Sequence, residues 1–224
     1  MEAIILCGGL GTRLRSVIKD IPKPMADING APFLQILLEF LLRQGVKKVI
    51  LAVSYKFEVI QGFFGSDFKG LKLIYSVENT PLGTGGAIKQ ALEFADENEN
   101  FVLNGDTFFD IDLSVLKLLP ESKITVALKK EQDFDRYGEV KLDEKGFISS
   151  FKEKEFVKSG LINGGIYKLR KDIFDDAGLN LGHHFLFEEF LSQHFKALKA
   201  YGQVFEDYFI DIGIPEDLKK FRQK

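Results

Sequence analysis

The chain has 224 residues, a formal net charge of −3 and one cysteine. This length suffices for one large α/β domain with a sizeable core, the small net charge argues against a nucleic-acid partner, and a single cysteine excludes an internal disulfide. The sequence shows no signal peptide and no apolar stretch long enough to span a bilayer. We therefore expect no membrane partner and a cytoplasmic location.

The first half of the chain alternates predicted strands and helices. Apolar runs bounded by turn residues predict strands, and wide apolar surfaces at helical spacing predict helices. The expected strands cover 3–6, 46–53, 71–77 and 101–103, and the expected helices cover 32–44, 57–64 and 84–95. Such alternation predicts a mostly parallel, doubly wound sheet with right-handed crossovers.

The second half has a different pattern, in which short strands are separated by polar turns. Strands are expected over 124–129, 138–142, 147–151 and 165–169, followed by a helix over 185–195, strand-like runs at 200–204 and 208–210, and a helix from Pro215. No linker composition separates the two halves. We therefore expect one domain over 1–224, with an N-terminal half at about 1–119 and a C-terminal half at about 120–224.

A glycine-rich stretch follows the first predicted strand. Residues 7–14 are Cys-Gly-Gly-Leu-Gly-Thr-Arg-Leu, and residues 22–24 are Pro-Lys-Pro. Closely spaced glycines let a ligand approach main-chain N–H groups, and the cations of Arg13 and Lys23 suit the phosphates of a nucleotide. The spacing excludes a Rossmann fingerprint, because Leu14 stands where a glycine is needed, and no Gly-Lys-Ser/Thr of a P-loop occurs. An ordinary flexible connection is the alternative.

These motifs resemble those of the sugar-1-phosphate nucleotidyltransferases, and the resemblance covers nearly the whole chain. Within that family, the runs most like those of the enzymes that guanylylate D-glycero-α-D-manno-heptose 1-phosphate lie at 14–16, 23–25, 29–30 and 83–86. Cys7 and Arg15-Ser16 depart from the Ala and Pro-Leu of many relatives. The resemblance implies an α/β, Rossmann-like, mixed and mostly parallel sheet of the GT-A-like type found in nucleotide-diphospho-sugar transferases.

The resemblance also implies a reaction. GTP would donate GMP to a sugar 1-phosphate, with Mg²⁺ as cofactor and with a GDP-sugar and pyrophosphate as products, for capsule or surface polysaccharide synthesis. Mannose-1-phosphate guanylyltransferase and glucose-1-phosphate uridylyl-, thymidylyl- or cytidylyltransferase are the alternatives. A glycosyltransferase and an inactive nucleotide-sugar-binding regulator are further alternatives, which release of pyrophosphate would exclude. These motifs are compatible with both a monomer and a homodimer.

By the same resemblance, nucleotide binding is assigned to Leu6, Gly8, Gly9, Gly11, Thr12, Arg13, Lys23, Glu78, Gly83, Thr84, Asn104 and Asp106. Arg13 would neutralise the leaving pyrophosphate and Lys23 the α-phosphate. Glu78 suits guanine, because a carboxylate accepts from both the N1–H and the amino group. The second glycine cluster, at 82–86, would let the flat base lie against the backbone at an electropositive helix N-terminus. An ordinary loop and helix start is the alternative.

Two aspartates follow buried strands, where ligands of α/β sheets bind. Asp106 and Asp211 could hold Mg²⁺ together with substrate phosphates, although each could equally cap a turn. The resemblance places both as metal ligands. Asp110 and Asp112 form an Asp-x-Asp pair like that of many glycosyltransferases, but Asp112 precedes an apolar run and is expected to cap a helix.

The acceptor motifs lie in the second half. The resemblance assigns the sugar phosphate to Tyr137, Gly138, Glu153, Lys154 and Asn163, with Lys154 on the phosphate and Glu153 on sugar hydroxyls. For residues 152–155, Lys-Glu-Lys-Glu, a solvated charged face is the alternative. Glu155 stands where the family usually has proline. The implied catalytic set is Arg13, Lys23, Asp106, Lys154 and Asp211. The spacing of His183, His184 and Glu188 is compatible with metal ligands on a helix. The surrounding phenylalanines instead favour an amphipathic helix without a metal.

Overall fold

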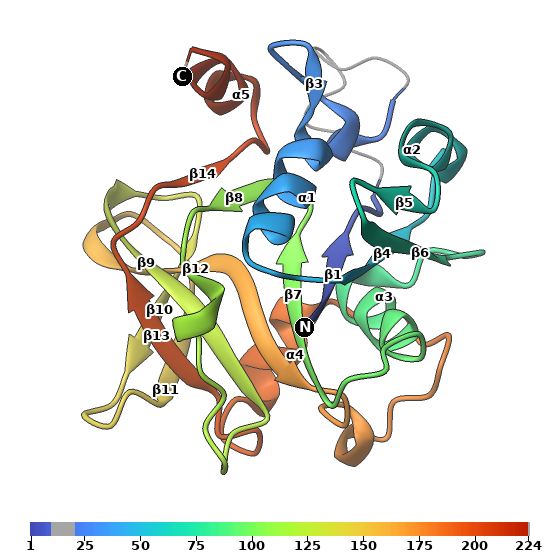
Figure 1. The fold of residues 1–224 in the computed structure, drawn as a ribbon. Coiled ribbons are helices and arrows are strands. Elements are labelled where there is room, and N and C mark those ends of the chain that lie inside the picture. The colour runs from blue at the N-terminus through green and yellow to red at the C-terminus, as the bar shows by residue number, and fades with distance from the viewer. Residues whose placement is uncertain (10–20, 224) are drawn as a thin grey trace.

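The computed structural model describes residues 1–9 and 21–223, which form a mixed α/β fold on a ten-stranded sheet (Figure 1). The predicted parallel core is confirmed, since β7, β1, β4 and β6 are neighbours in that order and run parallel. The strands are β1 (Glu2–Leu6), β4 (Lys48–Val53), β6 (Leu71–Val77) and β7 (Glu99–Asn104). The helices between them are α1 (Phe33–Arg43), α2 (Phe57–Phe64) and α3 (Gly83–Leu92).

The second half of the chain extends this sheet largely with antiparallel strands. They are β9 (Ile124–Phe134), β10 (Gly138–Leu142), β11 (Ile148–Lys154) and β12 (Val157–Arg170), with β13 (Tyr201–Phe205) parallel to β9. β12 joins the two halves, because it pairs with β7, β9 and β10. β9 and β12 are longer than the predicted 124–129 and 165–169, because their mutual pairing continues past the apolar runs.

Several short elements complete the chain. The strands are β2 (Asp27–Ile28), β3 (Ala31–Pro32), β5 (Asp67–Phe68), β8 (Thr107–Phe109) and β14 (Phe209–Asp211). The helices are η2 (Lys23–Met25), η3 (Leu113–Val115), η4 (Asp175–Ala177), α4 (Phe187–His194) and α5 (Pro215–Arg222). None of the helices described here is long and apolar enough to cross a membrane. The pairing of β8 with β14 was not predicted and proves important for the site.

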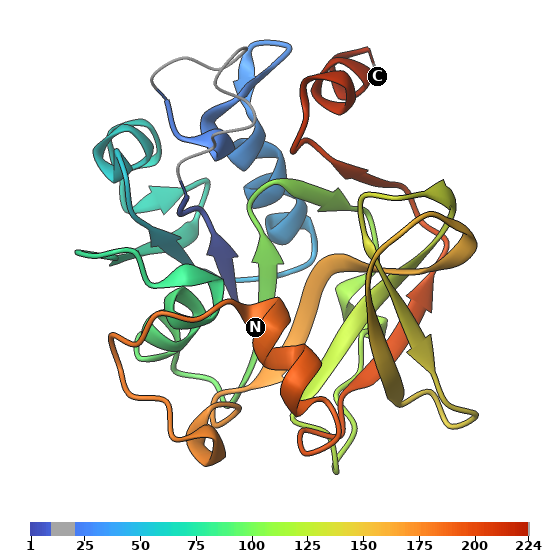
Figure 2. The same cartoon turned by 180° about the vertical axis from the view of Figure 1, so that it is seen from behind.

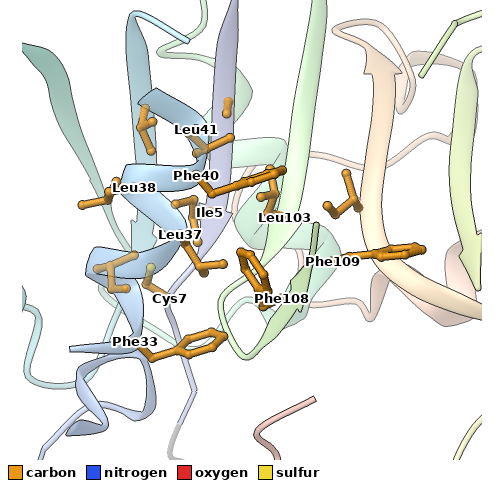
Figure 3. Close-up of a cluster of buried hydrophobic side chains, with 14 of the residues drawn as sticks. Ile5, Cys7, Phe33, Leu37, Leu38, Phe40, Leu41, Leu103, Phe108 and Phe109 are labelled. Carbon is orange, nitrogen blue, oxygen red and sulfur yellow. The ribbon is translucent and has the colours of Figure 1, made fainter. Parts of the chain in front are cut away.

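The core lies on both faces of the sheet, because buried strands alternate their side chains between the two faces. In β1, Ala3 and Ile5 pack under α1, whereas Ile4 packs on the opposite side. Figure 3 shows the first cluster, in which Leu37 and Phe40 of α1 lie over Ile5 and near Phe108. Figure 2 shows α4 on the face opposite α1, where its apolar residues join those of α3. The strand ends between these layers carry the candidate site.

Candidate active site

Three adjoining cavities follow the carboxyl ends of the parallel strands, where α/β sheets bind ligands. The first cavity, about 650 Å³, lies between residues 54–58 and 77–84. The central cavity, about 640 Å³, contains Asp106 and Asp211, and the third cavity, about 410 Å³, contains Glu153. The first and central cavities share Leu6, Gly8, Thr84 and Leu186, and the central and third cavities share Tyr137, Lys154, Asn163 and Glu188. The shared walls make them one continuous cleft.

Glu78 follows β6 and lines the first cavity. Its Oε2 accepts a hydrogen bond of 2.9 Å from the Leu82 N–H. Its Oε1 lies so near Gly8 that a Cβ there would come within 2.9 Å, so a larger residue at position 8 would displace the carboxylate. Burial raises the pKa of Glu78, while the Leu82 hydrogen bond and the nearby His184 oppose that shift. Because only one hydrogen bond from the described residues reaches its Oε2, the ionised side chain has further acceptor capacity at the cavity wall.

The second glycine cluster packs against another segment of the chain. Residues 183–187, here called the strap, pack directly onto the start of α3. A Cβ on Gly85 would lie 2.2 Å from the Phe185 ring, and one on Gly86 would lie 2.5 Å from the His183 carbonyl oxygen. The Gly85 N–H donates to the Phe185 carbonyl at 3.0 Å. Packing against the strap thus accounts for Gly85 and Gly86, while Gly83 and Thr84 line the first cavity, where the base is predicted to bind.

The central cavity brings together the two aspartates that the sequence singled out. Asp106 follows β7, and the β8–β14 pairing aligns Thr107 with Asp211. The Ile212 N–H donates to the Asp106 carbonyl at 2.9 Å, which fixes this alignment. Burial, followed by the neighbouring charge of Asp106, raises the pKa of Asp211. Because the two carboxylates line one cavity and repel each other, a cation bound between them would be stabilised.

The surroundings of these carboxylates fit Mg²⁺. Mg²⁺ is typically held by one or two protein carboxylates, with the remaining positions filled by phosphate oxygens and water. The described residues offer such a pair but no group of three His, Cys, Asp or Glu side chains that could hold a metal alone. Lys23, from η2, forms an ion pair with Asp106 and lines the same cavity. The donor set therefore suits a metal that arrives with phosphates.

Arg136 is a site residue that the sequence reasoning missed. Its guanidinium pairs with Asp217 of α5 at 2.5 Å and lies 3.5 Å from Asp211 Oδ2. The hydroxyl of Tyr137 donates to the same Asp211 oxygen at 3.3 Å, and the Gly213 N–H donates to Asp211 Oδ1 at 2.6 Å. Three neighbouring groups, from Arg136, Tyr137 and Gly213, thus position the Asp211 carboxylate. The available signal was the position of Arg136 immediately before the Tyr137-Gly138 motif.

The predicted acceptor residues line the third cavity together. Tyr137, Gly138, Glu153, Lys154 and Asn163 all belong to its wall. The Asn163 amide donates to the Tyr167 hydroxyl at 2.7 Å and accepts from the Gly165 N–H at 3.0 Å, which holds its orientation. The sequence reasoning did not predict that α4 completes this wall with Glu188, Glu189, Leu191 and Ser192.

The remaining sequence predictions have mixed outcomes. Gly11, Thr12 and Arg13 lie outside the described residues. Leu6, Gly8, Gly9 and Asn104 line the first or central cavity as expected. Asp112 caps η3 by accepting from the Ser114 N–H at 2.8 Å. Within the part of the chain that the structure describes, neither Asp110 nor Asp112 contributes to the cleft.

Comparison with known proteins gives a consistent picture. The chain is 63% identical over 221 residues to D-glycero-α-D-manno-heptose 1-phosphate guanylyltransferase of Campylobacter jejuni, covering 99% of this chain and 98% of the relative. It is 44% identical to the enzyme of that name from Aneurinibacillus thermoaerophilus, over 100% and 98% of the two chains. The crystal structure of HddC from Yersinia pseudotuberculosis complexed with GMP-PN matches with a TM-score of 0.84 and 38% identity, over 99% and 98% of the chains. The family model "Nucleotidyl transferase" matches residues 2–224, and the chain belongs to this family.

Proposed function

We propose that this protein transfers GMP from GTP to D-glycero-α-D-manno-heptose 1-phosphate, forming GDP-heptose and pyrophosphate. The observation that carries the proposal is the continuous cleft, in which a carboxylate suited to guanine, a charged centre and a polar acceptor cavity follow one another. The similarity of the whole chain to heptose 1-phosphate guanylyltransferases supports the same base and the same sugar.

Base recognition begins at Glu78. The Leu82 N–H occupies one lone pair of its Oε2, so Oε1 and a second lone pair of Oε2 can accept from the two adjacent donors of guanine. Uracil and thymine present one donor next to acceptor oxygens, which a carboxylate matches less well. Guanine is therefore favoured over uracil and thymine.

The transfer itself is a displacement at phosphorus. An oxygen of the sugar phosphate attacks the α-phosphorus of GTP in line, the new O–P bond forms, and the bond to the β-phosphate oxygen breaks with departure of pyrophosphate. The attacking oxygen is already anionic, so no general base is needed, and catalysis consists of alignment and charge neutralisation. Lys23 in the central cavity would neutralise the α-phosphate, and Lys154 at the shared wall would hold the acceptor phosphate against repulsion.

The metal requirement is part of the proposal. Asp106 and Asp211 would hold Mg²⁺, which supplies charge neutralisation of the triphosphate when it is bound. Lys23 pairs with Asp106 in the protein alone, so phosphates entering the cavity would compete for this ammonium group. Arg136 and Tyr137 would keep Asp211 oriented for the metal.

The test is release of pyrophosphate with each of four nucleoside triphosphates and a panel of sugar 1-phosphates, with and without a chelator. We expect GTP and heptose 1-phosphate to give the highest kcat/KM, and the chelator to stop the reaction. Release of nucleoside diphosphate instead of pyrophosphate would indicate a glycosyltransferase. A pyrimidine triphosphate as the preferred donor would refute the guanylyltransferase assignment.

A further inference from the structure

Helix α4 presents two different faces, and one of them forms part of the third cavity. Its apolar residues Phe187, Phe190 and Leu191 are buried against the sheet. Its polar residues Glu188, Glu189 and Ser192 line the third cavity. A spacing of three or four residues places side chains on the same face of a helix. The first turn of α4 is thus an acidic wall of the space in which the acceptor sugar is proposed to bind.

The two glutamates occupy different positions along the cleft. Glu188 lines both the central and the third cavity, as do Lys154 and Asn163. Glu189 lines the third cavity and is not part of the wall described for the central one. Since the acceptor phosphate must face the central cavity to attack GTP, Glu189 lies toward the end of the sugar that is remote from the phosphate.

The Glu189 carboxylate is available to a ligand. In the described ranges 1–9 and 21–223, no hydrogen bond or ion pair engages its side chain, and only its backbone carbonyl accepts from the Ser192 hydroxyl, at 2.8 Å. By contrast, the Lys152 ammonium on the same cavity wall is already paired with Glu139 at 3.0 Å. A carboxylate has two acceptor oxygens and no donor, so it matches a pair of neighbouring hydroxyl groups.

We infer that Glu189 determines specificity for a sugar that carries a glycol beyond its ring, by accepting hydrogen bonds from both hydroxyls. The inference rests on the proposed function. A heptose 1-phosphate differs from mannose 1-phosphate in its exocyclic C6–C7 glycol, which replaces the single C6 hydroxyl on C5 and carries the hydroxyl that can reach furthest from the phosphate. This is the only part of the substrate that separates the two acceptors, and Glu189 lies on the part of the cavity wall that is not shared with the central cavity.

The experiment compares wild type, Glu189→Gln and a control variant with heptose 1-phosphate and mannose 1-phosphate, each at saturating GTP. Glutamine has the same shape, but it is neutral and carries an NH2 donor in place of one acceptor oxygen, so the charge-assisted hydrogen bonds to the glycol are lost. The control is Glu216→Gln, because Glu216 is an exposed glutamate in the first turn of the eight-residue helix α5 and lines none of the three cavities. Thermal unfolding of all three proteins checks that they are folded.

We expect Glu189→Gln to lower kcat/KM for heptose 1-phosphate by roughly 10- to 100-fold, the range for one hydrogen bond to a charged group. The loss should be mainly in KM, and mannose 1-phosphate should change less than about threefold, as should Glu216→Gln with either acceptor. An equal loss with both acceptors, or no loss with heptose 1-phosphate, would overturn the inference and leave the proposed function intact. Wild type that releases no pyrophosphate with heptose 1-phosphate would overturn both.

Discussion

Replacement of Gly85 by alanine tests why a glycine stands at this position of α3. The added Cβ would lie 2.2 and 2.3 Å from two carbons of the Phe185 ring, whereas ordinary contact begins at 3.4 Å. The ring would have to withdraw by more than about 1 Å. It is held by Phe174 and Phe190, with ring centroids 5.4 and 5.9 Å away, and by the hydrogen bond from Gly85 to the Phe185 carbonyl. The strap therefore resists the movement.

The expected magnitude follows from two opposing effects. Overpacking of this kind costs about 1–3 kcal/mol, and the restricted unfolded chain of an alanine variant returns about 0.4–1 kcal/mol. We expect Gly85→Ala to lower the free energy of unfolding by about 1–2 kcal/mol. Gly62→Ala is the matched control, because Gly62 is also helical, in α2, and an added Cβ would meet nothing within 4 Å. That variant should gain about 0.5–1 kcal/mol.

Urea unfolding of the two variants and wild type measures both free energies, provided that the slopes against urea agree. KM for GTP, measured on the folded proteins, reports any direct effect on the nucleotide. A Gly85→Ala protein as stable as Gly62→Ala, with KM for GTP raised, would show that the glycine serves the base and that the strap yields without cost. That result would refute the packing argument and support the role predicted from the sequence.

Three further predictions concern the charged groups of the cleft. Lys23→Ala should lower turnover by ~10²–10³ at saturating substrates without unfolding the protein, and turnover near that of wild type would remove Lys23 from the mechanism. If Asp106 and Asp211 share one metal, the double Asp→Asn variant should be little worse than the poorer single variant, and additive losses would argue for separate roles. Glu78→Gln should lose most of the preference for GTP over pyrimidine triphosphates. Because burial raises the pKa of Glu78, acidification should raise KM for GTP in wild type, and the variant should lack this component.

Features of local sequence were predicted well because they depend on neighbouring residues. The strands over 71–77 and 138–142 and the helix over 57–64 have the bounds expected from their apolar spacing and turn residues. Asp112 caps η3 because a carboxylate directly before an apolar turn can accept from N–H groups two residues on. The predicted acceptor residues lie together on the wall of one cavity, and their binding of the sugar phosphate stays a prediction.

By itself, then, the sequence determined the alternating elements, the parallel core and the motif residues, because periodicity and turn chemistry are local. Only the tertiary structure decided which distant residues meet. The closeness of Asp106 to Asp211 results from the pairing of β8 with β14, two three-residue strands too short to give a periodic signal. Likewise, the packing of Phe185 on Gly85 and the presence of Glu189 in the third cavity depend on where α4 docks against α3 and the sheet. Docking is set by complementary surfaces from separate segments, and neither segment carries that information alone.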